Sequence, residues 1–202
     1  MKTLNKLYLS AALLSGFSSL TYAQYSVEKT NFTKAEIEQI VENKIEELKE
    51  KESLVESAKS EIIELVLNTK NLYASTVSYK GLNNDILIKA GAIPKTMEVY
   101  EDKQRVLNHF KKDVIIEETI LERDKKTSAL KIVYAGVPKE VCKSLFIEIP
   151  ELFLKVEVEN KNGITLIYDI SKDVQKNNQL ISKEKIEEGC NSEENTLILK
   201  RT

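Results

Sequence analysis

Apolar residues recur with helical spacing over residues 34–75, the longest regular pattern in the chain. They come at intervals of three, four or seven residues and therefore lie on one face of a helix. These positions are Ile37, Val41, Ile45, Leu48, Val55, Ala58, Ile62 and Val66. The stretch holds no proline or glycine, and Thr33 with Glu36 fits a capping box at its start. We therefore predict one long helix of about forty residues.

The two halves of this helix are expected to differ. Residues 62–67 are mostly aliphatic, which indicates burial in a core, whereas the apolar stripe is thin at residues 50–53. An exposed stripe needs a partner, and we assign partner binding to its N-terminal residues Ile37, Val41, Ile45, Leu48 and Val55. A coiled coil is one interpretation of this stripe. Packing on the chain's own domain is the other.

Residues 76–202 contain several segments in which apolar and polar positions alternate, as in half-buried strands. The expected strands are Val114–Leu121, Leu130–Tyr134, Leu152–Val158, Ile164–Ile170 and Leu197–Leu199. In Leu152–Val158 every second residue is aliphatic, which predicts one buried face. Asn160–Gly163 is a hairpin turn signal between the third and fourth strands. No element is predicted for Glu98–Lys112, and the strand order stays open.

Three short helices complete the expected elements. Asn84–Ala90 ends before Gly91, a second helix runs from Pro138 to about Ile149, and Ser182–Glu188 is closed by Gly189. The combination predicts an α+β fold, in which a long N-terminal helix packs on a mainly antiparallel β-sheet with short helices.

The N-terminal residues have the pattern of an export signal. Lys2 and Lys6 precede the apolar run Leu7–Leu20, and small residues follow, so we predict cleavage between Ala23 and Gln24. The run is shorter than the roughly twenty residues that span a bilayer, although a retained anchor is the alternative. The expected parts are a signal peptide at 1–23, a tether at 24–33, the helix at 34–75 and a globular head at 76–202. The mature chain, exported and without a membrane span, would reside in the periplasm, at the cell surface or outside the cell.

Charge and composition narrow the function. The formal net charge is −2, and the charges are evenly mixed, so we expect neither nucleic acid nor a membrane surface as a partner. His109 is the single histidine, and pairs such as Glu117-Glu118 fit solvated surfaces. No phosphate-binding glycine loop or nucleophile elbow is present. We expect no catalytic residue, metal or cofactor, and a soluble enzyme is a remote alternative.

The chain has two cysteines, Cys142 and Cys190. In an exported protein the simplest expectation is one disulfide. The bond would close a loop of about fifty residues and contribute roughly 4 kcal/mol. Two unpaired buried thiols are the alternative.

Short motifs of residues 57–202 resemble, in their order and in the placement of the cysteines, the head of type IVb pilins, the group that includes PilS-like and toxin-coregulated pilins. The motifs are Leu72-Tyr73, Tyr79-Lys80-Gly81-Leu82, the helix ending at Ala90-Gly91, Ile93-Pro94, Gly136–Leu145 with its cysteine, and Cys190 near the C-terminus. The resemblance implies a pilin-like head fold. It also implies partners among other pilus or secretion-apparatus subunits, or a second copy through the N-terminal helix.

The N-terminus departs from the pilin pattern. Gly16-Phe17 resembles a prepilin cleavage point, but no glutamate follows it and the apolar segment stops at Ala23. In pilins a longer apolar helix anchors the subunit and forms the filament core. The resemblance therefore implies a minor or accessory component of a type IVb pilus or conjugative apparatus, acting by protein–protein binding. A secreted adhesion or virulence factor that reuses a pilin head is the alternative.

Overall fold

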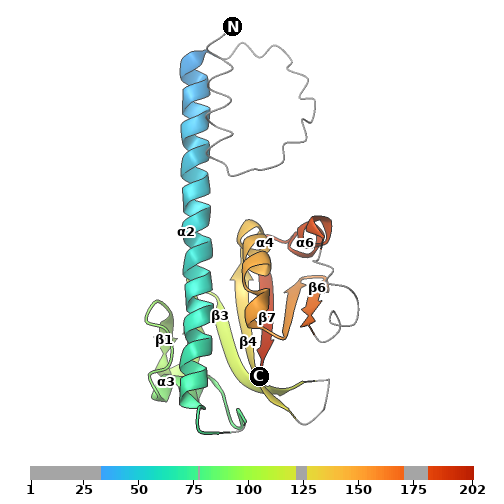
Figure 1. Ribbon diagram of the computed structural model, residues 1–202. Helices are drawn as coiled ribbons and strands as arrows, with labels where there is room; N and C mark the ends of the chain where they lie inside the picture. Colours follow the sequence, from blue (N-terminus) through green and yellow to red (C-terminus); the bar gives the residue numbers. More distant parts are fainter. Residues whose placement is uncertain (1–32, 77, 122–126, 171–181) are drawn as a thin grey trace. The chain divides into compact units, whose positions relative to one another are not determined.

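The computed structural model describes residues 33–76, 78–121, 127–170 and 182–202 (Figure 1). The predicted signal peptide, with its cleavage site at Ala23 and Gln24, and nearly all of the tether lie outside these residues. The chain divides into two compact units, residues 1–50 and 51–202, which are described separately.

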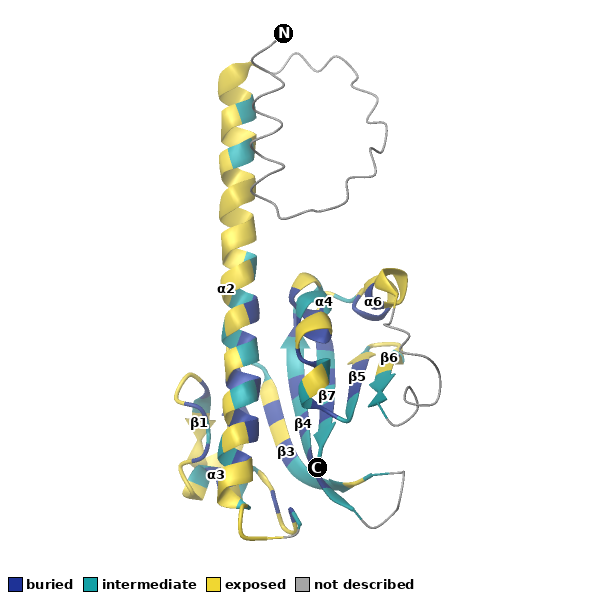
Figure 2. Cartoon of the chain, in the orientation of Figure 1, coloured by how far each residue is buried: buried dark blue, intermediate teal, exposed yellow. Residues whose placement is uncertain are grey.

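Helix α2 spans Lys34–Leu72, 39 residues. The predicted capping box is confirmed: the Thr33 amide donates to Glu36 Oε2 at 2.6 Å, and the Glu36 amide donates to Thr33 Oγ1 at 3.3 Å. These two bonds satisfy amides that the first helical turn leaves unpaired. In the first unit, every residue from 34 to 50 is exposed except the half-buried Ile37 and Val41 (Figure 2).

The second unit is built on a seven-stranded sheet in which all neighbouring strands are antiparallel. The strands are β1 Glu98–Tyr100, β2 Arg105–Leu107, β3 Asp113–Ile120, β4 Ser128–Val137, β5 Lys155–Asn160, β6 Gly163–Asp169 and β7 Asn195–Arg201. Their order is β1-β2-β3-β4-β7-β5-β6. The C-terminal strand β7 thus lies between β4 and β5 and joins the β1–β4 part of the sheet to the β5–β6 hairpin.

Short helices flank the sheet: α3 Asn84–Lys89, α4 Lys139–Glu148 and α6 Lys183–Gly189, with 3-10 turns η1 Glu101–Lys103 and η2 Pro150–Leu152. One hydrophobic core includes residues of α2 from Val55 onward, of α4 and of the strands. Figure 1 shows α4 lying across β4 and β7. The α+β fold class predicted from the sequence is therefore confirmed.

The prediction for Leu152–Val158 is wrong in two respects. Pro150 starts the 3-10 turn η2, which takes up Leu152, so β5 begins only at Lys155. The segment also does not have a single buried face, because Phe153 and Glu157 are buried along with the valines.

The last residue of α6, Gly189, is a glycine at a close approach between two elements. A Cβ atom at Gly189 would lie 2.5 Å from the Cβ of Leu166 on β6. Any larger residue would push α6 away from the sheet. The predicted turn at Asn160–Gly163 is confirmed, since β5 and β6 pair with Asn160 opposite Gly163.

Candidate functional site

The two cysteines form the predicted disulfide. Cys142 lies on α4, Cys190 follows the last residue of α6, and their Cα atoms are 5.8 Å apart. Both residues are fully buried. The alternative of two free thiols is therefore wrong, and the bond fixes α6 to α4 across a sequence separation of 48 residues.

An ion pair beside the disulfide joins the same two helices. The side chain of Lys143 is only 13% exposed, and its Nζ lies 2.7 Å from Glu140 Oε1 and also contacts Glu187 on α6. Burial lowers the pKa of Lys143, but hydrogen bonds to both carboxylates outweigh this and raise the pKa above its usual value. Lys143 therefore stays charged and reinforces the α4–α6 contact.

Glu61 is a buried carboxylate with a structural role. Its Oε2 accepts a hydrogen bond from the Tyr134 hydroxyl at 2.5 Å and from the His109 amide at 3.2 Å. The residue thereby holds the turn after β2 and strand β4 against α2. Burial first, and the Glu61 carboxylate second, raise the pKa of Tyr134. The imidazole of His109 is exposed, and only its backbone takes part.

Glu157 on β5 is also buried, but it is paired with cations. Its two carboxylate oxygens each lie 2.8 Å from a lysine Nζ, that of Lys155 and that of Lys200. Burial alone would raise the pKa of Glu157, but the two lysines lower it below its usual value. The periodicity of the sequence could not reveal this buried ion cluster, because its residue types are those of an exposed strand face.

The predicted partner-binding residues divide between the two units. Ile37 and Val41 are half-buried, and Ile45 and Leu48 are exposed by 38% and 47%. The prediction that Val55 binds a partner is wrong, because Val55 is only 5% exposed and belongs to the core of the second unit. It is unavailable to a partner.

One exposed residue of this face was missed by the prediction. Ile40 is 52% exposed and follows Ile37 by three residues, so helical spacing already places the two side by side. We call Ile37, Ile40, Val41, Ile45 and Leu48 the apolar stripe.

Two other kinds of feature are absent from the described residues. Among them no group of three or more His, Cys, Asp or Glu side chains is placed to hold a metal ion. Within the same ranges, no helix combines the length and apolar character needed to cross a membrane.

Comparison with known proteins identifies the second unit. The family model described as "PilS N terminal" matches residues 52–202, most of the chain. The chain belongs to the PilS family. The crystal structure of type IV b pilin from Salmonella typhi is similar with a TM-score of 0.50 at 15% identity, over 72% of this chain and 99% of that chain. A search of curated proteins gives no match.

The motifs behind the resemblance have defined roles in this type IVb pilin-like fold. In Tyr79–Leu82 the Leu82 amide donates to the Tyr79 carbonyl at 2.9 Å, and Gly81 has φ +81°, which favours glycine. Glu118 on β3 anchors this turn, because its carboxylate accepts from the Gly81 amide and from the Ser128 hydroxyl. The apolar stripe, in contrast, lies before the first residue that the PilS family model matches.

Proposed function

We propose that this PilS-family chain is an exported minor or accessory subunit of a type IVb pilus or of a related conjugative apparatus. It acts by binding other subunits and not by catalysis. The PilS match and the pilin-like fold support a structural role. The observation that carries the binding role is the apolar stripe on the first-unit part of α2.

The exposed residues of the stripe can supply useful binding energy. Burying a fully exposed leucine or isoleucine contributes about 1.5–3 kcal/mol. Ile40, Ile45 and Leu48 are each roughly half exposed. Covering all three is therefore worth about 2–4 kcal/mol before association costs, which suits a docking contact that acts with others.

The test is recovery of the chain with the assembled apparatus. Cells that make the pilus are fractionated, and the wild-type chain is compared with I45S/L48S. The substituted chain is expected to be lost from the filament or apparatus fraction, while its head unfolds at the same temperature as wild type. The matched control is Q39S/N43S on the polar face of the same segment, which is expected to behave as wild type.

Two results would contradict the assembly role. Recovery of I45S/L48S with the apparatus at the wild-type level would remove the stripe as a docking surface. Recovery of the wild-type chain only as free protein in the medium would favour the secreted adhesion factor instead.

We also propose that export proceeds through cleavage between Ala23 and Gln24, the expectation from the apolar run and its small-residue end. Sequencing the N-terminus of the mature chain tests it. A start at Gln24 is the expected result, and a start at Phe17 would instead indicate prepilin-type processing.

A further inference from the structure

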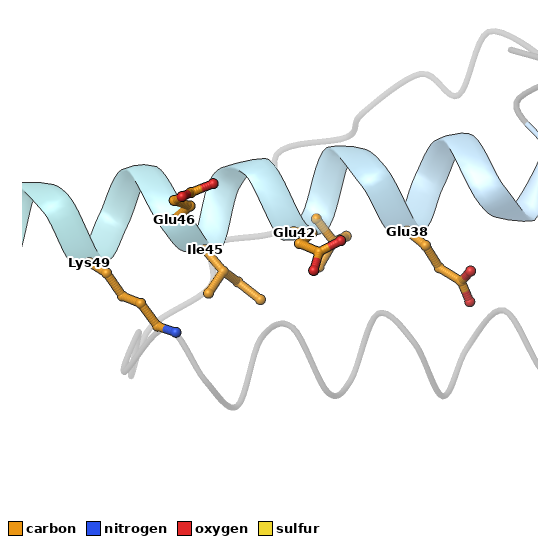
Figure 3. A pocket seen from close by; sticks show the side chains of 6 residues that line it. Glu38, Glu42, Ile45, Glu46 and Lys49 are labelled. Carbon is orange, nitrogen blue, oxygen red and sulfur yellow. The ribbon is translucent and has the colours of Figure 1, made fainter.

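Two neighbouring rows of side chains run along the helix where the apolar stripe meets the acidic side chains. Glu38, Glu42 and Glu46 follow one another at four-residue intervals, and so lie in line on the helix surface. Val41, Ile45 and Lys49 form the neighbouring row. Together these six residues line one shallow groove, and Figure 3 looks onto this face. We call Glu38, Glu42 and Glu46 the acidic row.

Negative charge is concentrated in this segment. Residues 34–50 carry three lysines and six glutamates, a net charge of −3, whereas residues 51–202 carry 24 basic and 25 acidic residues. Residues 34–50 therefore hold more net negative charge than the much longer residues 51–202. This imbalance favours a partner of opposite charge.

The acidic row is also poorly neutralised within the segment. Glu38 forms an exposed pair with Lys34, at 3.4 Å, and Lys44 pairs with Glu47 on another side. Neither Glu42 nor Glu46 has an ion-pair partner among the described residues. Like charges four residues apart destabilise a helix by about 0.2–0.5 kcal/mol per pair. Cations brought by a partner would remove this cost.

We propose that the groove receives a basic amphipathic helix of another protein. Its apolar side chains cover Val41 and Ile45, and its lysines or arginines lie along the acidic row. Helices pack in this way when a side-chain ridge of one enters the groove between two i, i+4 rows of the other. The inference rests on the proposed function, because it specifies the chemistry of the partner that the stripe binds.

A second copy of this chain fits the groove less well. It would bring the same net charge of −3 to the contact, so that carboxylates would face carboxylates. Like charges facing each other across an interface act against that pairing. The charge of the segment therefore selects a different, basic chain.

The test uses the whole chain and two synthetic helical peptides of about 21 residues with the same isoleucine and leucine face. One peptide carries lysines beside that face, and the other carries glutamates. Binding is followed by fluorescence anisotropy. The wild-type chain is expected to prefer the lysine peptide by about tenfold, the ratio for two or three exposed pairs that change sign.

Two charge-reversed variants identify the row. E46K is expected to lower the preference for the lysine peptide, whereas E47K makes the same change of charge away from the groove and should keep it. Equal affinity for both peptides would overturn the inference. An equal loss of preference in the two variants would do so too, because it would reflect net charge alone.

Two further outcomes would assign the groove to another occupant and so overturn the proposal. One is a wild-type dimer in sedimentation that V41S/I45S abolishes. The other is peptide binding that begins only after residues 1–32 are removed. If I45S/L48S leaves the apparatus but E46K stays, the basic partner is refuted while the proposed function stands.

Discussion

Replacing both cysteines by alanine removes the covalent link between α4 and α6. The Cys142–Cys190 bond encloses β5, β6 and α6 in one loop, with a sequence separation of 48 residues. Within the sheet, the β5–β6 hairpin pairs with the remaining strands only through β7. The sheet therefore connects the β5–β6 hairpin to the other strands through β7 alone, and the disulfide adds a second, covalent connection.

The expected cost follows from the length of the loop. A crosslink that closes about fifty residues lowers the entropy of the unfolded chain by an amount worth about 4 kcal/mol at 25 °C. The Lys143–Glu187 pair still joins the two helices in C142A/C190A, but it does not restrict the unfolded chain as the covalent bond does. The variant should therefore lose most of the 4 kcal/mol, and its melting temperature should fall by about 8–16 °C.

Urea unfolding of the oxidised wild type, the reduced wild type and C142A/C190A measures this cost. The oxidised protein should exceed both others by about 4 kcal/mol in free energy of unfolding, and reductant should leave the variant unchanged. A difference below about 1 kcal/mol would refute the loop argument. So would equal effects of reductant on the wild type and the variant.

Three other substitutions probe buried contacts, again by urea unfolding. E61A should lower the free energy of unfolding by about 1–3 kcal/mol, because it leaves the Tyr134 hydroxyl without its acceptor. E61A/Y134F should lower it by less than the sum of the two single substitutions. Strictly additive effects would contradict an interaction between the two side chains. The pKa of Glu157 is lower in the folded chain than its usual 4.5, so its stabilisation is present above pH 4.5 and is lost as the pH falls below that value. E157Q should therefore be less stable at neutral pH, with a flatter decline between about pH 5 and pH 3, and an unchanged acid profile would contradict the ion cluster. G189A should cost about 1–3 kcal/mol. L166G removes the Cβ atom that the new methyl group meets, so G189A/L166G should cost less than the sum of the two single changes, and strict additivity would place the strain elsewhere.

Local signals predicted most of the elements. The capping box at Thr33, the turn at Asn160–Gly163 and the short helix predicted from Ser182, whose side chain accepts from the Lys185 amide, each depend on residues close in sequence. Such signals are readable because the bonds that they describe form within one turn. Strands β3, β4 and β7 were found for a related reason, since their alternation reports one buried face.

Pairing between strands that are distant in sequence could not be predicted from such local signals. Strands β1 and β2 have three residues each, too few for alternation to show, and so Glu98–Lys112 gave no prediction. The position of β7 inside the sheet depends on its pairing with β4 and with β5, both distant in sequence. The buried ion pair of Glu157 could not be predicted for the same reason, because its partner Lys200 lies on another strand.

The apolar stripe shows what periodicity leaves out. The same spacing runs through Ile45 and Ile62, yet the first is exposed and the second is fully buried. Periodicity reports which residues share a helix face, and does not report what covers that face. The frequency of charged residues is a better guide to burial along this helix. Nine of the 17 residues from 34 to 50 are charged, but only four of the 16 residues from 54 to 69. A buried helix cannot carry so many charges, so the change near residue 52 marks where the core begins.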